Sequence, residues 1–370
     1  MLEMRSHTGA GQALIGKRTG DDLALTKGSH ISYGQYGRQQ LLTSTLFGIY
    51  RQQIQTQQIY EKKLALRQRF YTLLSSQMKE KIDLYLIGSS LTGFGCNSSD
   101  TDFCLIIYDS EDNIDKRYDN KHTVLSKLEE LKQILQSNSV SDNPQVIPAL
   151  VPILKFIESS TGIEVNINVN RIVTIRNTHL MHMYCQMDSR VAPLILTLKL
   201  WARKNGINSA FNKSLTSYSI ALMAIYYLQN VCNPPVVPCL QKEYPELFVE
   251  EVTRLRLEDY KKVRFRTKNS QKLGQLFTEF LEYFCLNFDF VKAISVRTSA
   301  LISRSELVPQ YDLNGKVWQS WCHICIEEPF DRTNTSHAVH ECRMFRHIYD
   351  SLKETYLRIK TQNLNFDRFI

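Results

Sequence analysis

The chain has 370 residues, of which 43% are apolar and 10% aromatic, a composition that builds packed cores and excludes a wholly disordered chain. This length corresponds to about two domains. The formal net charge of +8 permits a polyanionic partner without establishing one. Nine cysteines, an odd number without a paired framework, lead us to expect a soluble protein in a reducing compartment. No secretion signal or membrane span is apparent, and we expect no membrane association.

The first part of the chain changes from a polar segment to a helical pattern. Residues 1–44 are rich in Gly, Ser, Thr and Gln, and we predict a flexible N-terminal tail there. From Leu46 to Leu74, apolar side chains recur at helical spacing among Gln, Lys and Arg. This pattern predicts helix ahead of the first strands.

Strands are predicted in the middle of the chain and helices in the remainder. The runs 151–157 and 163–169 are rich in β-branched residues, which favours strands. In the second run, apolar residues alternate with Glu164, Asn166 and Asn168, which places these three side chains on one face. Helical periodicity returns later, in the segments 178–187, 191–204, 216–228, 270–284 and 340–359. We therefore predict a β-rich catalytic domain, 80–176, inserted in a helical domain made of 45–79 plus 177–370.

The stretch 84–108 carries the clearest chemical signal. A short apolar run is followed by the turn Gly88-Ser89, a Gly/Asn/Ser loop and a second apolar run that begins with Asp100-x-Asp102. A Gly-Ser turn lets backbone N–H groups approach a phosphate closely. The two aspartates share one face of a strand and repel each other unless a cation lies between them. The pattern favours a Mg²⁺–nucleotide site; the alternative is a surface hairpin with an Asp-rich start.

Four further segments extend this signal along the chain. They are Ile175-Arg-Asn-Thr178, Leu198-Lys-Leu-Trp-Ala202, Leu215-Thr-Ser-Tyr-Ser219 and Ile326-Glu-Glu-Pro-Phe-Asp-Arg-Thr-Asn-Thr335. With these motifs, which cover about residues 80–345, the chain resembles the cytoplasmic non-canonical poly(A) polymerases of the germ-line (GLD) type. These are polymerase-β-like nucleotidyltransferases. The resemblance implies an α+β fold: a mixed-sheet nucleotidyltransferase domain, a helical central (PAP-associated) domain, and an active site in the cleft between them.

The resemblance also implies an activity and a set of site residues. The activity is template-independent addition of AMP from ATP to RNA 3′ ends, with Mg²⁺, for which Mn²⁺ can substitute. Asp100 and Asp102 would ligate the metal. The implied nucleotide contacts are Gly88, Ser89, Lys199, Arg203 and Ser217 at the triphosphate, Asn177 and Thr178 at the ribose, Tyr218 on the base, and Glu328, Asp331 and Asn334 in the loop that lines the base pocket.

The residue at 334 bears on the choice of nucleotide. In relatives that add uridylate, a histidine near this place crowds the pocket against a purine. Asn334 stands here instead, which favours ATP. His337 lies three residues further on, so a terminal uridylyltransferase stays open as an alternative.

Asn166 departs from the pattern that the resemblance implies. The family has a third metal-binding carboxylate at this place, whereas an amide offers a carbonyl oxygen without negative charge and cannot act as a base. Three explanations stay open: an engineered isosteric replacement, a naturally inactive homologue, or rescue by Glu164 one step along the same strand face. We expect a weakened or inactive enzyme that still binds nucleotide. A catalytically dead homologue that binds RNA or partners is therefore a second alternative.

A basic segment near residue 265 is the candidate RNA contact. If it forms a strand, four cations lie on one face, which suits an RNA backbone; a solvated sheet edge explains the pattern equally well. The cations are Lys262, Arg264, Arg266 and Lys268. No signature of a sheet-type RNA-binding domain is present. The resemblance therefore implies mRNA 3′ ends, not DNA, as substrate, and a separate RNA-binding protein that recruits the enzyme in the cytoplasm.

Overall fold

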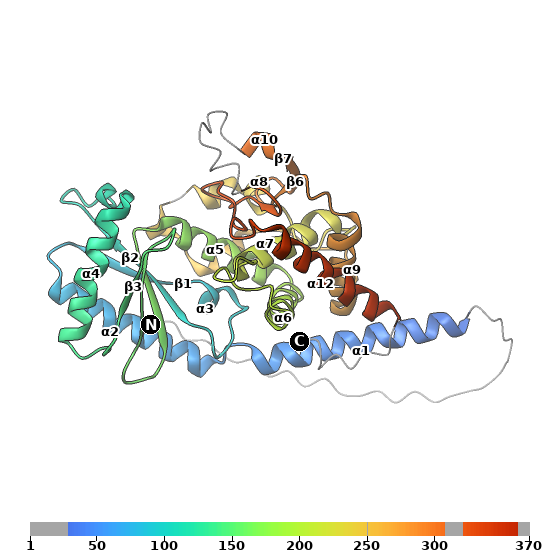
Figure 1. Ribbon diagram of the computed structural model, residues 1–370, viewed down its shortest axis with the longest axis horizontal. Coiled ribbons are helices and arrows are strands. Elements are labelled where there is room, and N and C mark those ends of the chain that lie inside the picture. Colours follow the sequence, from blue (N-terminus) through green and yellow to red (C-terminus); the bar gives the residue numbers. More distant parts are fainter. Residues whose placement is uncertain (1–28, 250, 308–320, 362–370) are drawn as a thin grey trace.

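The computed structural model describes residues 29–249, 251–307 and 321–361. Within these ranges the chain forms a sheet unit and a helical unit, which lie side by side (Figure 1). In spatial order, the strands of the main sheet are β1 (Ile82–Ile87), β2 (Thr101–Ile107), β5 (Glu164–Val169), β4 (Ile153–Ile157) and β3 (Gln145–Ile147). β2 and β5 are parallel neighbours, and the other pairs are antiparallel. The mixed sheet confirms the predicted α+β fold.

Two helices cover one face of this sheet, and one of them lies in an unexpected place. They are α2 (Gln57–Gln77) and α4 (Lys121–Ser137). The prediction assigned residues 45–79 to the helical unit, but the apolar stripe of α2 is buried against the sheet. The Phe70 ring lies 5.8 Å from the Phe103 ring and 5.7 Å from the Phe156 ring, measured between centroids. α2 therefore belongs to the hydrophobic core of the sheet unit.

Phe70→Ala is expected to destabilise the protein strongly, because Phe70 is 1% exposed and fills the space between α2 and the sheet. Truncating a buried phenylalanine costs about 3–5 kcal/mol of the free energy of unfolding. Phe211, which is 96% exposed, supplies the matched control, since Phe211→Ala is expected to change that free energy by less than about 0.5 kcal/mol. Urea unfolding of both variants checks this, and equal losses would contradict the packing of α2 on the sheet.

The helical unit is built from the later segments and from the first helix. Among the described residues, no helix is long and apolar enough to cross a membrane. A small sheet in spatial order β7 (Ala300–Ser303), β6 (Lys292–Ser295) and β8 (Cys325–Ile326) caps the unit. Its longer helices are α1 (Ser29–Gln53), α5 (Ile172–Met187), α6 (Val191–Lys204), α7 (Ser217–Tyr226), α9 (Leu273–Glu282) and α12 (Cys342–Thr361). Short helical turns include α3 (Ser89–Thr92), α8 (Leu240–Glu243) and α10 (Arg304–Leu307).

Helix α1 begins inside the segment that was predicted to be a flexible tail. Residues 29–44 are helical, and residues 1–28 of the predicted tail lie outside the described residues. The side chains of Leu42 and Leu46 are buried in the core of the helical unit. α1 crosses α9 closely at Gly274, where a Cβ atom would lie 2.8 Å from the Gln39 carbonyl oxygen. The Gly274 N–H donates to Thr43 Oγ1 at 3.0 Å, so a few contacts order an otherwise polar helix.

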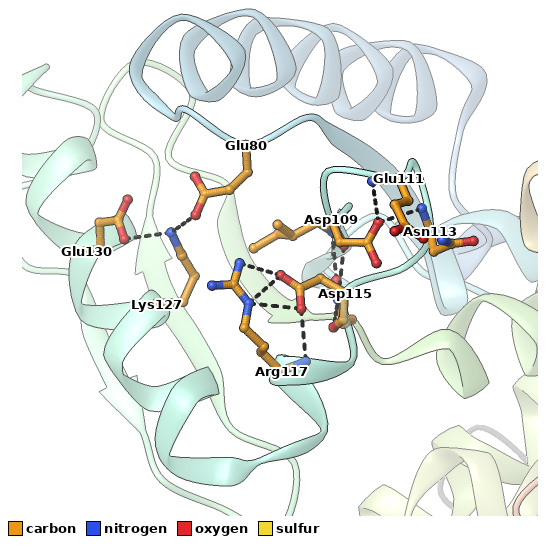
Figure 2. Close-up of polar contacts among 10 residues, drawn as sticks. Glu80, Asp109, Glu111, Asn113, Asp115, Arg117, Lys127 and Glu130 are labelled. Atoms are coloured by element: carbon orange, nitrogen blue, oxygen red, sulfur yellow. Dashed lines mark hydrogen bonds and ion pairs between the residues drawn. The ribbon is translucent and has the colours of Figure 1, made fainter.

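Ion pairs fix the outer corner of the sheet unit (Figure 2). Lys127 of α4 is 7% exposed and lies 2.8 Å from the Glu80 carboxylate and 2.7 Å from that of Glu130. In the preceding turn, the buried carboxylate of Asp115 accepts from Arg117. The Arg117 side chain lowers the pKa of Asp115. Lys127 thereby holds α4 to the segment between α2 and β1, and the Asp115–Arg117 pair stabilises the turn before α4.

The predicted basic strand is wrong in its secondary structure. Residues 257–262 form a 3₁₀ helix, and residues 263–272 form neither helix nor strand. Val263 is nevertheless buried and Phe265 packs against the core of the helical unit. The alternation of the sequence thus follows an extended loop, in which Arg264, Arg266 and Lys268 are exposed; Lys262, at the end of the 3₁₀ helix, is exposed as well.

Candidate active site

A cavity of about 480 Å³ opens where the sheet unit meets the helical unit. Its walls come from the end of β1, the starts of α3 and β2, the β5 strand, and helices α5, α6 and α7. The lining brings together most of the residues that the resemblance implied: Gly88, Ser89, Asp100, Asp102, Asn166, Asn177, Thr178, Lys199, Arg203, Ser217 and Tyr218. Residues far apart in sequence therefore converge on one site, where the resemblance implied a cleft between the two domains.

Two carboxylates and one amide form the floor of this cavity. Asp102 on β2 pairs in parallel register with Asn166 on β5. The Asn166 Nδ2 group donates to Asp102 Oδ1 at 3.0 Å and to Asp100 Oδ2 at 3.2 Å. Burial raises the pKa of Asp102, and the hydrogen bond from Asn166 opposes that rise. The amide thus bridges the two carboxylates as a neutral donor, in the position where charge compensation is needed.

The donor set at this floor fits a hard divalent cation, although with one negative charge fewer than a three-carboxylate site. Asp100 and Asp102 present carboxylate oxygens toward one point. Asn166 Oδ1 is buried and has no hydrogen-bond partner among the described residues, so turning the amide over would present this oxygen to a cation. Glu164 is paired with Lys155 and lies outside the cavity lining. The structure gives no support for rescue of the missing charge by Glu164.

The Gly88-Ser89 turn closes tightly over the acidic pair. Gly88 has φ +69°, and a Cβ atom there would lie 2.8 Å from Asp102 Oδ2. Glycine is therefore required both for the backbone conformation and for the close approach. The Gly88 N–H donates to Thr178 Oγ1 at 2.9 Å, and Thr178 Oγ1 donates to the Thr174 carbonyl at 2.6 Å. Thr178 thereby fixes the turn to α5 in addition to lining the cavity.

Helix α6 supplies positive charge from the opposite wall. Lys199 and Arg203 are one helical turn apart and both line the cavity. Lys199 is buried; its Nζ donates to the Phe94 carbonyl at 3.2 Å and lies 5.1 Å from the centre of the Phe94 ring. Burial lowers the pKa of Lys199 to about 8. Its charge is therefore sensitive to pH just above neutrality.

Binding of a nucleoside triphosphate is expected to weaken as pH rises through about 8, because Lys199 attracts the phosphates only while its side chain is protonated. The folded-state pKa lies below the ordinary value of 10.5, so the charge is present below about pH 8 and is lost above it. Fluorescence anisotropy with a labelled ATP between about pH 7 and pH 9.5 measures this. Lys199→Arg keeps its charge throughout and should flatten the profile; an unchanged profile would rule out Lys199 as its origin.

The residues implied at the base lie partly inside and partly behind the cavity wall. Tyr218 lines the cavity, and its hydroxyl donates to Glu328 Oε1 at 3.0 Å. Glu328 also accepts from the N–H groups of Phe330 and Asp331. The Asn334 side chain is buried in the loop itself, where Oδ1 accepts from the Ile326 N–H at 3.0 Å. Glu328, Asp331 and Asn334 are absent from the cavity lining; Glu328 and Asn334 organise the loop behind Tyr218.

Several cavity residues carried no signal in the sequence. Phe94, Thr174 and Met181 line the cavity but resemble ordinary core residues. Asn168 also lines it, and its Oδ1 is buried without a partner among the described residues. The strict alternation of β5 placed Asn168 beside Asn166, and this was the available signal.

Comparison with known proteins agrees with this geometry. Residues 42–186 match the family described as "Poly(A) RNA polymerase, mitochondrial-like, central palm domain", and residues 272–334 match the "Cid1 family poly A polymerase". The chain is 40% identical over 279 residues to poly(A) RNA polymerase GLD2 of Xenopus tropicalis, covering 74% of the chain and 49% of that protein. It is 37% identical over 285 residues to human GLD2, covering 75% of the chain and 56% of that protein. The chain thus spans about half the length of these two relatives.

Solved structures extend the comparison to nearly the whole chain. The GLD-2 chain of the "GLD-2/RNP-8 complex" superposes with a TM-score of 0.72 at 31% identity, over 90% of this chain and 98% of that chain. A "Cytoplasmic RNA Terminal U-transferase" shares the fold, with a TM-score of 0.72 at 20% identity, over 89% of this chain and 98% of that chain. The family matches, the GLD2 relatives and the superposition on the GLD-2 structure show the family. The chain belongs to the GLD-2-type non-canonical poly(A) RNA polymerases of the polymerase-β-like nucleotidyltransferase superfamily.

Proposed function

We propose that this chain binds ATP and Mg²⁺ in the interdomain cavity and adds AMP to RNA 3′ ends without a template, at a rate limited by Asn166. The observation that carries the proposal is the convergence, in one cavity, of the glycine turn, two carboxylates and the basic face of α6. These groups match the three needs of nucleotidyl transfer: a phosphate cradle, a metal site and compensation of the triphosphate charge.

The residues divide the work according to their positions. The Gly88-Ser89 turn offers backbone N–H groups and a hydroxyl to the triphosphate, while Lys199 and Arg203 face it from α6. Tyr218, oriented by Glu328, offers its ring to the base. The RNA 3′-hydroxyl then attacks the α-phosphorus in line, the bond to the β,γ-diphosphate breaks, and pyrophosphate leaves. Asn166 cannot accept the proton of the attacking hydroxyl, whereas an aspartate there could.

The metal enters at one point of this scheme. Asp100 and Asp102 would hold it, with the Asn166 carbonyl oxygen as a neutral third ligand after the amide turns. Mg²⁺ bound there would neutralise phosphate charge and activate the attacking hydroxyl. Mn²⁺, which accepts the same oxygen ligands, is proposed to substitute for it.

The proposed nucleotide is ATP, because His337 does not reach the cavity: its Nδ1 contacts the Asn334 carbonyl at 2.9 Å. The test is incorporation of ATP and UTP into an oligo(A) primer by the Asn166→Asp protein. Preferential addition of A supports the proposal. Preferential addition of U would assign a terminal uridylyltransferase, and no addition of either nucleotide would refute nucleotidyl transfer.

A second candidate is a homologue that binds nucleotide, RNA or partners without turnover. The specific observation in its favour is the amide bridge from Asn166 to both carboxylates. Binding of Mg²⁺–ATP by the chain as written, measured with a fluorescent analogue alongside the absence of tail addition, would favour this candidate.

RNA is proposed to approach over the basic loop. Changing Arg264, Arg266 and Lys268 together to glutamine should weaken oligo(A) binding and reduce the slope of log K against log[salt] by about 2, since each lost phosphate contact contributes about 0.7 for a single strand. A matched triple change of the exposed Lys62, Lys79 and Lys116 in the sheet unit should leave the slope unchanged. Equal slopes in both triple variants would remove the basic loop from the RNA path.

The relatives support a proposal about partners, and the cysteines support one about location. The neighbouring GLD-2 structures are complexes with RNP-8 and GLD-3, and we propose that a separate RNA-binding protein likewise brings mRNA to this chain. All nine cysteines are free, and seven of them are buried, which fits a reducing compartment such as the cytoplasm.

A further inference from the structure

A buried lysine lies directly beneath the candidate active site. Lys63 on α2 is 1% exposed, although lysine is almost never fully buried without partners. Its ammonium group has three acceptors: Ser90 Oγ at 3.0 Å, the Ser99 carbonyl at 2.9 Å and the Asp100 carbonyl at 3.3 Å. All three of its hydrogens are therefore used, and all three acceptors belong to the loop that carries the phosphate turn and the first aspartate.

The loop that Lys63 holds is otherwise short of internal structure. It runs from the Gly88-Ser89 turn to Asp100 and contains no long helix or strand. Its other ties come from several elements: the Gln55 N–H donates to the Gly95 carbonyl at 2.8 Å, the Thr56 N–H donates to Asn97 Oδ1 at 2.8 Å, and Lys199 Nζ of α6 donates to the Phe94 carbonyl at 3.2 Å. Lys63 contacts both ends of the loop, at Ser90 near its start and at Ser99 and Asp100 at its end.

We propose that Lys63 is a positioning residue for nucleotidyl transfer, which sets the distance between the phosphate turn and Asp100 by binding Ser90, directly after the turn, and the Asp100 carbonyl through one ammonium group. The inference rests on the proposed function, since it assigns a task within that reaction. An uncharged side chain of similar length offers the carbonyls of Ser99 and Asp100 no donor, and the loop relaxes.

The test uses the Asn166→Asp protein as the active background and Lys63→Met as the variant. Lys62→Met is the matched control, because Lys62 is the exposed neighbour on the same helix. At saturating Mg²⁺ and ATP, kcat per folded molecule is expected to fall about a hundredfold in Lys63→Met and to stay unchanged in Lys62→Met, since a displacement of about 1 Å costs this much in catalysis. Ser90→Ala, which removes one of the three acceptors, should give a smaller loss.

Two outcomes overturn the proposal. If the role of Lys63 is purely structural, Lys63→Met lowers Tm and the folded fraction while kcat per folded molecule stays constant. If the role of Lys63 is purely electrostatic, Lys63→Met lowers the Mg²⁺ concentration needed for half-maximal rate and leaves kcat at saturation unchanged. If Lys63→Met does not fold, a Ser90→Ala kcat equal to that of the background also overturns it.

Failure of the proposed function is distinguishable from failure of this inference. If the Asn166→Asp background adds no nucleotide, the proposed function has failed, and Lys63 is then tested by Mn²⁺-dependent binding of a fluorescent ATP analogue. Weaker binding by Lys63→Met than by Lys62→Met, about tenfold or more, supports the positioning role. Equal binding by the two variants refutes it.

Discussion

Asn166→Asp is expected to raise the rate of tail addition by roughly 10²–10³-fold, because it restores a negative charge at the point where the metal and the attacking hydroxyl meet. The amide now donates to Asp100 and Asp102 at 3.2 and 3.0 Å. An aspartate of the same shape would repel both carboxylates without a metal, and would ligate the metal when it is present. The gain should therefore be accompanied by tighter, cooperative Mg²⁺ dependence.

Primer extension with ATP, compared between the two proteins across a range of Mg²⁺ concentrations, measures this gain. Asn168→Asp is the matched control, since Asn168 lies two residues further along the same strand face. It adds the same charge at a different position and is expected to give no comparable gain. Full activity of the chain as written would show that the amide at 166 suffices.

Gly88→Ala is expected to weaken nucleotide binding by tenfold or more. The new methyl carbon would lie 2.8 Å from Asp102 Oδ2, in a backbone conformation with φ +69° that alanine rarely adopts. The turn must shift, and its N–H then loses the hydrogen bond to Thr178 Oγ1. Both the phosphate cradle and the orientation of Asp102 change together.

Titration with a fluorescent ATP analogue in the presence of Mg²⁺ checks this expectation. Gly48→Ala is the control, because a Cβ atom there meets no atom within 4 Å and Gly48 lies within α1. It should bind nucleotide normally and, if anything, unfold at a slightly higher temperature. Normal binding by Gly88→Ala would mean that the turn does not contact the triphosphate.

The sequence predicted the site more fully than the packing around it. The two aspartates share one strand face because side chains alternate along a strand, and the Gly88 turn lies beside them because β1 pairs with β2. The position of α2 escaped prediction for a physical reason. An apolar stripe such as Leu66, Phe70 and Leu74 shows that one helix face is buried, and contains no information about which surface buries it.

Polar side chains near the base pocket were predictable in position but not in direction. An asparagine can bind a ligand or satisfy its own loop, and Asn334 satisfies Ile326 and Ser336 instead of facing the cavity. For the basic segment, the exposed positions were predicted correctly but the secondary structure was not. Its alternation arises because Val263 and Phe265 pack inward along an extended loop, which produces the same period of two as a strand.

One continuous stretch of the chain supplies side chains to both cores. Leu42 and Leu46 of α1 fill the helical unit, and about twenty residues later Leu66 and Phe70 of α2 fill the sheet unit. A recombinant fragment that starts at residue 57 would keep the core of the sheet unit but expose the part of the helical core that Leu42 and Leu46 cover. Such a fragment is expected to aggregate or to recruit α1 from another molecule, so deletion mapping of this protein should keep α1 intact.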